Sequence, residues 1–269
     1  MRPHPSCPSD PRRPSLRYRC LARVIIGCMH LMRWKVETQG LGHVPPRGGA
    51  VIAINHVSHV DFLVTALTIY RELNRPIRFL AKHELWDMRW LGWLLRWVHA
   101  IPVEESVHGD HRTTLEAAVA ALRDGDLVLV APEGGISRSF DLLPFHTGAV
   151  RMSREVGVPL IPSVSWGSQR LSTTGHPVRI LKSFGIPITV RFGSPIQLKQ
   201  GGDAMVSTVA LRHRMAMMLG EAQRNYPDGL PAGVYWVPAR LGGGATPHEL
   251  VLRERGLSSN AGPVAHLGS

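Results

Sequence analysis

Residues 50–62 read AVIAINHVSHVDF, an apolar run followed at once by a polar segment. The run 50–54 predicts a buried strand, and apolar side chains at three- and four-residue steps over 60–73 predict a helix. His56 therefore lies in the turn that leaves the strand, and Asp61 lies in the first turn of the helix. A bent turn of this length can bring the Asp61 carboxylate back onto the His56 imidazole.

The pairing of His56 with Asp61 has a chemical use. A carboxylate holds an imidazole in one tautomer and leaves its other nitrogen free as a base, which can take a proton from an alcohol. The structural alternative is that His56 caps or packs the strand end, while Asp61 only favours the helix dipole. His59 is a second candidate base in the same turn, but it lacks this spacing to Asp61.

A second polar loop, APEGGISRS at 131–139, follows another predicted strand at 126–130. In open α/β sheets, ligand sites form just outside the carboxyl ends of strands. Two predicted strand ends thus carry His, Asp, Glu and Arg side chains. Taken alone, the Pro-Glu-Gly-Gly segment is better explained as an ordinary surface turn.

Strand-like and helix-like runs alternate along the chain, which predicts an α/β layered domain with a mostly parallel mixed sheet flanked by helices. The predicted strands are 50–54, 77–81, 100–103, 126–130, 159–165 and 187–192. The predicted helices are 60–73, 84–98, 110–123, 147–156 and 203–222.

The order of these segments resembles the 1-acylglycerol-3-phosphate acyltransferase family of glycerolipid acyltransferases. That family carries, in order, Asn-His-x-Ser-x-x-Asp, Ile-Pro-Val, Phe-Pro-Glu-Gly-Thr-Arg-Ser and Val-Pro followed by two hydrophobic residues and Pro. The counterparts here are 55–61, 101–103, 132–138 and 158–162, within a resemblance that covers roughly 38–200. The resemblance implies a fold like that of the glycerol-3-phosphate acyltransferases.

The resemblance also implies roles for individual residues. His56 corresponds to the general base, and Asp61 to the residue that orients it. Arg138 corresponds to the residue that contacts the phosphate of the acceptor. The residues implied to shape the turn or to bind substrate are Asn55, Ser58, Glu133, Gly134, Ser137 and Arg138.

Three positions depart from the family pattern. Glu105 and Ile136 stand where the family usually has Arg, and His146 stands where it commonly has Lys. An Arg binds phosphate through a bidentate fork that Glu cannot replace and would repel. The departures therefore leave the acyl-transfer chemistry intact and leave the exact acceptor open.

The reaction implied by the resemblance moves a fatty acyl group from acyl-CoA, or from an acyl carrier protein, to a lysophospholipid hydroxyl. The implied acceptor is 1-acylglycerol-3-phosphate. We expect no cofactor and no metal site, and no covalent acyl-enzyme, because the sequence has no G-x-S-x-G nucleophile elbow. The alternatives are an acyltransferase for a different lipid acceptor and a catalytically impaired lipid-binding homologue.

The chain carries a formal charge of +11, and residues 1–36 contribute +7 of it, from eight Arg and Lys against one Asp. A basic arm can bind nucleic acid or anionic lipid. The mostly apolar run 21–34 is shorter than the roughly 20 residues that span a bilayer, but it suits a helix lying in the membrane interface. A helix that packs on the core is the alternative.

We therefore expect a peripheral protein at the cytoplasmic face of the cell membrane, with no nucleic-acid partner, because nucleic-acid-binding motifs are lacking. Its predicted parts are a disordered basic arm at 1–15, an amphipathic interface helix at 16–36, an acyltransferase domain at 37–239 and a flexible tail at 240–269.

Overall fold

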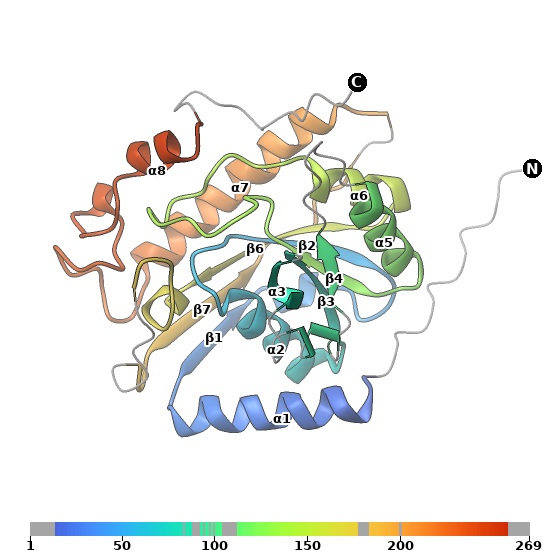
Figure 1. Cartoon of the computed structure of the whole chain (residues 1–269), viewed down its shortest axis with the longest axis horizontal. Helices are drawn as coiled ribbons and strands as arrows, with labels where there is room; N and C mark the ends of the chain where they lie inside the picture. The colour runs from blue at the N-terminus through green and yellow to red at the C-terminus, as the bar shows by residue number, and fades with distance from the viewer. Residues whose placement is uncertain are drawn as a thin grey trace, which may run out of the picture.

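The computed structural model describes residues 14–82, 84–87, 92–93, 95–96, 98, 100–103, 112–176, 183–198 and 201–257. Its centre is a seven-stranded sheet in the order β1-β7-β6-β2-β5-β3-β4 (Figure 1). Neighbouring strands are parallel except β6 and β7, which are antiparallel. The predicted fold, a mostly parallel mixed sheet flanked by helices, is confirmed. The strands are β1 Lys35–Gln39, β2 Ala50–Ile54, β3 Ile77–Lys82, β4 Ile101–Val103, β5 Leu127–Val130, β6 Leu160–Trp166 and β7 Pro187–Phe192.

Strand β2 lies in the middle of the sheet because every one of its side chains is apolar and buried. It pairs in parallel with β5 on one side and with β6 on the other. A parallel sheet needs cover on both faces, and continuous apolar strands of this kind provide both faces of the core. The carboxyl ends of β6, β2 and β5 therefore meet at one edge.

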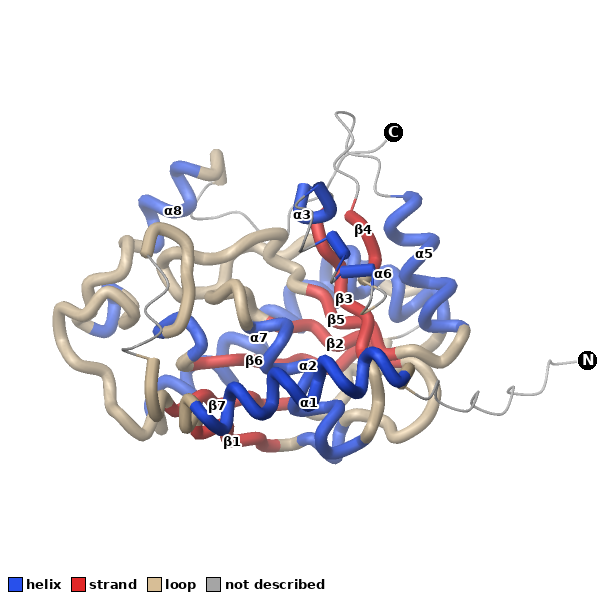
Figure 2. Tube along the Cα trace, turned by 60° about the horizontal axis from the view of Figure 1, so that its bottom comes forward, coloured by secondary structure: helices blue, strands red, loops and turns tan. Residues whose placement is uncertain are grey.

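Helices cover both faces of the sheet. The helices are α1 Leu16–Leu31, α2 Asp61–Leu73, α3 Glu84–Asp87, α5 Arg112–Arg123, α6 Gly148–Val156, α7 Ala204–Arg224 and α8 His248–Glu254. Buried residues of α5, α6 and α7 join one core cluster, and those of α2 join the cluster on the opposite face. Helix α1 packs outside α2 (Figure 2).

The described strands include one that the sequence did not predict. Strand β1 alternates exposed and half-exposed residues and holds the edge of the sheet beside β7. Its polar composition, KVETQ, hides the strand signal because few of its side chains enter the core. The predicted helix 84–98 is described only in part, as α3 and short pieces, and Glu105 lies outside the described residues.

Two predicted boundaries are corrected by the structure. Helix α1 ends at Leu31, so the last residues of the predicted interface helix 16–36 belong to strand β1 instead. The predicted tail 240–269 is also wrong in its first half, because α8 packs against the domain and buries Val251 and Leu252 with Leu143. The helix has three apolar residues, which are consecutive, so its seven residues show no helical periodicity in the sequence.

Candidate active site

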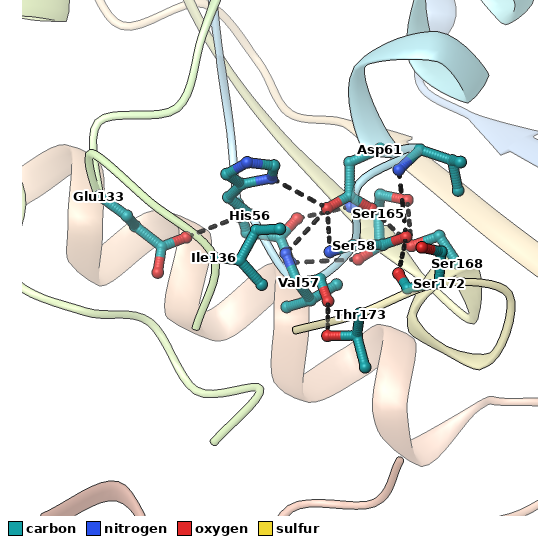
Figure 3. Close-up of polar contacts among 12 residues, drawn as sticks. His56, Val57, Ser58, Asp61, Glu133, Ile136, Ser165, Ser168, Ser172 and Thr173 are labelled. Atoms are coloured by element: carbon teal, nitrogen blue, oxygen red, sulfur yellow. Dashed lines mark hydrogen bonds and ion pairs between the residues drawn. The ribbon is translucent and has the colours of Figure 1, made fainter. Parts of the chain in front are cut away.

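Three loops meet where β6, β2 and β5 end side by side. The β2 loop carries Asn55 to Asp61, the β5 loop carries Pro132 to Arg138, and the β6 loop carries Ser168. Figure 3 shows side chains from these loops joined by polar contacts. This edge is where ligand sites form in open α/β sheets.

The Asp61 carboxylate is fully buried at the start of α2. Its Oδ2 accepts hydrogen bonds from the backbone N–H of Val57 at 2.8 Å and of Ser58 at 2.7 Å. Its Oδ1 accepts from the Ser168 hydroxyl at 2.5 Å. His56 Nδ1 lies 3.4 Å from Oδ2, so the predicted pairing is present and long (Figure 3). Such contacts often tighten when substrate binds.

His56 itself is held by its backbone rather than by its ring. Its N–H donates to Glu133 Oε1 at 2.8 Å, and its carbonyl accepts from Ser137 N–H at 2.8 Å. The ring packs against Phe62 in a T-shaped arrangement with a centroid distance of 5.2 Å, and 18% of the side chain is exposed. The backbone contacts fix the position of the His56 main chain, and the partial exposure leaves the imidazole accessible to a substrate.

Glu133 is a second buried carboxylate, and it joins two loops. Oε1 accepts from His56 N–H, and Oε2 accepts from Leu143 N–H at 2.9 Å. Burial raises the pKa of Glu133 from 4.5 to about 8, and the two backbone N–H donors oppose the rise. Both oxygens are used to hold backbone, which gives Glu133 a positioning role. That it also contacts the acceptor stays a prediction.

Asn55 and Ser58 are buried and bond to the β6 side of the site. Asn55 donates from Nδ2 to the Ser165 carbonyl at 3.1 Å and accepts from Ser165 N–H at 2.7 Å, which continues the pairing of β2 with β6. The Ser58 hydroxyl donates to the Ser172 carbonyl at 2.6 Å. These bonds shape the turn, as the resemblance implies.

The remaining predicted residues lie on the β5 loop. Ser137 is buried, and its hydroxyl donates to the Asp141 carbonyl at 2.7 Å. Gly134 has φ +69°, and an added Cβ would lie 3.0 Å from His146 Nε2. Arg138 forms an ion pair with Glu254 of α8. A phosphate that binds Arg138 would have to share the guanidinium with the Glu254 carboxylate or displace that carboxylate.

The sequence model of the family described as Acyltransferase matches residues 35–166. This span of the chain is similar to the acyltransferase family. The resemblance drawn from the four motifs is thereby confirmed, and the matched span contains His56, Asp61 and Glu133. Ser168 and the whole of α8 lie beyond it.

Two sequence relatives of this chain are enzymes that carry the same activity in their names. A 1-acyl-sn-glycerol-3-phosphate acyltransferase of Bacillus subtilis is 29% identical over 136 residues, which are 51% of this chain and 65% of that relative. The alpha form of Mus musculus is 30% identical over 148 residues, which are 54% of this chain and 50% of that relative. The aligned part therefore spans less than two thirds of each relative.

A solved structure shares the fold. The crystal structure of the 1-acyl-sn-glycerophosphate (LPA) acyltransferase PlsC from Thermotoga maritima matches with a TM-score of 0.62 at 17% identity. The match covers 77% of this chain and 80% of that chain. The shared fold therefore extends through most of the chain.

Sequence reasoning missed two contributors to the site. Ser168, the partner of Asp61, follows β6 by two residues, and the rule that sites form at strand ends would have nominated its loop. No sequence signal pointed to helix α8, because the helix is short and lies far in the sequence from the other site residues.

Asp61→Ala should lower the free energy of unfolding by at least about 2 kcal/mol, since it leaves the buried donors of Val57, Ser58 and Ser168 without their acceptor. His56→Ala is the matched control and should lose less than about 1 kcal/mol, because its ring is partly exposed. Urea denaturation of both variants measures the difference. Equal losses would show that Asp61 does not hold the turn.

Glu133→Gln should lower the free energy of unfolding by about 1–3 kcal/mol, because Gln offers a single side-chain acceptor for two N–H donors. The stability advantage of the native chain should shrink as pH rises. A raised pKa means that the folded chain binds the Glu133 proton more tightly, so the Glu133 contribution is complete below pH 4.5 and declines toward pH 8.

Urea denaturation of both proteins between pH 5 and pH 9 measures this dependence on Glu133. The control is Glu155→Gln on α6, whose side chain is half exposed beside Arg123. An advantage that grows with pH would contradict the raised pKa of Glu133.

Proposed function

We propose that this chain transfers a fatty acyl group from acyl-CoA to the free hydroxyl of 1-acylglycerol-3-phosphate. The observation that carries the proposal is the partly exposed His56 imidazole beside the buried Asp61 carboxylate, at a strand end and within the family's motif. The names of the Bacillus subtilis and Mus musculus relatives support the acceptor. An acyl carrier protein is the alternative donor of the same thioester.

His56 acts as the general base in this proposal. Its Nε2 takes the proton of the acceptor hydroxyl while the oxygen attacks the thioester carbonyl carbon. When the tetrahedral intermediate collapses, the carbon–sulfur bond breaks, and the proton passes from His56 to the departing thiolate. The Asp61 carboxylate lies on the Nδ1 side of the ring, where it favours the imidazolium that forms between these steps.

The loop after β5 is the proposed place of the acceptor's phosphate. Arg138 follows Glu133 on this loop, and its ion pair with Glu254 keeps the guanidinium at the edge of the site. Gly134 brings the backbone of the loop close to His146 without a side chain between them. The residues that hold the loop in place are those that also hold His56.

We further propose that α1 attaches the protein peripherally to the cytoplasmic face of the membrane. Leu16, Val24 and Leu31 are 69%, 64% and 78% exposed, and Cys20 and Cys28 are also exposed. These residues recur at three- and four-residue steps, so they form one outward apolar stripe. A helix with such a stripe and neighbouring cations suits the boundary between headgroups and acyl chains.

The opposite face of α1 is already used. Tyr18 and Ala22 are buried against Leu67 of α2. Beside them Arg19, Arg23 and the α2 residue Tyr70 line one surface hollow, which gives phosphate headgroups a cationic contact next to the apolar stripe. Within the part of the chain that is described, the helices lack the combination of length and hydropathy needed to cross a bilayer.

The function is tested with purified protein, an acyl-CoA and a panel of acceptors, with the mass of each product measured. We expect acylation of 1-acylglycerol-3-phosphate above other lysophospholipids. His56→Ala should reduce turnover by at least about 10²–10⁴-fold. The control is His213→Ala, which changes an exposed histidine on α7. Normal turnover by a folded His56→Ala protein would refute the mechanism, and binding of lipid without any acylated product would favour the impaired homologue.

The membrane proposal predicts that replacing Leu16, Val24 and Leu31 by Ser weakens vesicle binding at least about tenfold, since burying one such side chain contributes about 1.5–3 kcal/mol. Co-sedimentation with anionic and neutral vesicles measures binding, and added salt should weaken the anionic case. The matched control replaces the exposed apolar residues of α7, which are Val206, Val209 and Met217. Equal weakening by both triple variants would reject α1 as the attachment face.

A further inference from the structure

Helix α8 brings a second arginine to the β5 loop. Arg255 directly follows the helix, and its Nη2 donates to the Ile136 carbonyl at 2.8 Å. A Cβ added to Gly135 would lie 3.0 Å from the same Nη2 and 3.3 Å from Nη1. The guanidinium therefore occupies the space above Gly135 and Ile136, where the family pattern has Thr and Arg.

The peptide unit between Ile136 and Ser137 connects Arg255 to the proposed base. Its carbonyl accepts from Arg255, and its N–H donates to the His56 carbonyl at 2.8 Å. Figure 3 shows Ile136 beside His56. An acceptor whose hydroxyl is at His56 thus has the Arg255 cation one peptide unit away.

Several contacts hold α8 in this place. Val251 and Leu252 are buried with Leu143. The Ser139 hydroxyl lies 2.8 Å from His248 Nδ1 at the start of the helix. Glu254 at its end pairs with Arg138. These contacts fix the position of the helix apart from the guanidinium of Arg255, which is an exposed residue.

The charge at this loop fits an anionic group. Burial raises the pKa of Glu133, and the nearby Arg255 cation opposes part of that rise. A guanidinium has five N–H donors, and the bond to Ile136 uses one of them. Arg138 pairs with Glu254, and Arg255, the next residue of the chain, bonds to Ile136, so two arginines reach the β5 loop.

We propose that Arg255 binds the phosphate of the acceptor and supplies, from the C-terminal helix, the cation that position 136 lacks. The inference rests on the proposed function and adds a specificity-determining residue to it. Arg255 is separated from Ile136 by 119 positions, so the compensation is made by packing and not by a neighbouring substitution.

The test compares kinetics with lysophosphatidic acid and with a phosphate-free monoacylglycerol. Arg255→Ala should raise the KM for lysophosphatidic acid about ten- to a hundredfold, because a charge-assisted bond is lost. The KM for monoacylglycerol and the KM for acyl-CoA should stay within about twofold, since the lost contact is made only with the phosphate. Arg255→Lys should recover part of the loss, because Lys keeps the charge without the fork. Arg253→Ala on the same helix is the matched control and should leave all three constants unchanged.

Two further variants separate phosphate binding from support of the loop. Arg255→Gln keeps a donor for the Ile136 carbonyl but removes the charge, so it should behave like Arg255→Ala. Ile136→Arg combined with Arg255→Ala should restore the low KM for lysophosphatidic acid, because it returns a cation to the family's position. Thermal unfolding of each variant confirms that the chain is folded.

The outcomes distinguish the two proposals. A native chain that acylates neither acceptor overturns the proposed function, and the role of Arg255 falls with it. If the native chain and the Arg255→Ala variant acylate lysophosphatidic acid with the same KM, the role of Arg255 is overturned and the proposed function stands. A native-like KM for lysophosphatidic acid in Arg255→Gln would also overturn this role. So would an equal rise in the KM values of both acceptors in Arg255→Ala, and either result would mean that Arg255 holds the loop.

Discussion

The burial of the Asp61 carboxylate is the constraint on which the site depends. Taking a carboxylate out of water is costly unless hydrogen-bond donors replace the water. The donors come from Val57 and Ser58 in its own turn and from Ser168 after β6. One side chain therefore closes the turn, starts α2 and joins β2 to the neighbouring strand.

Glu133 makes the same use of burial on the other side of β2. Its two oxygens hold the N–H groups of His56 and Leu143, so the β5 loop cannot move without moving the backbone of His56. The imidazole itself makes a long contact with Asp61 and remains partly exposed. The rigid part of the site is thus the backbone around His56, and the ring is the part left to respond to substrate.

The cationic side chains around the site differ in position from those of the family pattern. Position 136, where the family usually has Arg, is Ile in this chain. Arg138 and Arg255 both lie at this loop, where Arg138 pairs with Glu254 of α8 and Arg255 bonds to the Ile136 carbonyl. At the far side of the sheet, α1 turns an apolar stripe outward beside Arg19 and Arg23. Each arrangement places cations where a phosphate is proposed to bind, one at the acceptor and one at the membrane surface.

The local sequence determined the central strands, the turn and the pairing of His56 with Asp61. An apolar run such as 50–54 can only be stable when buried, and the five-residue spacing of His56 and Asp61 closes within one turn. The edge strand β1, the Ser168 donor and the Arg255 cation were decided by tertiary structure. Ser168 and Arg255 reach their partners across 107 and 119 positions, and β1 is stabilised by pairing with β7 rather than by burial of its own side chains. Contacts of that range depend on which elements pack together, because residues so far apart become neighbours only after the sheet and its helices have assembled.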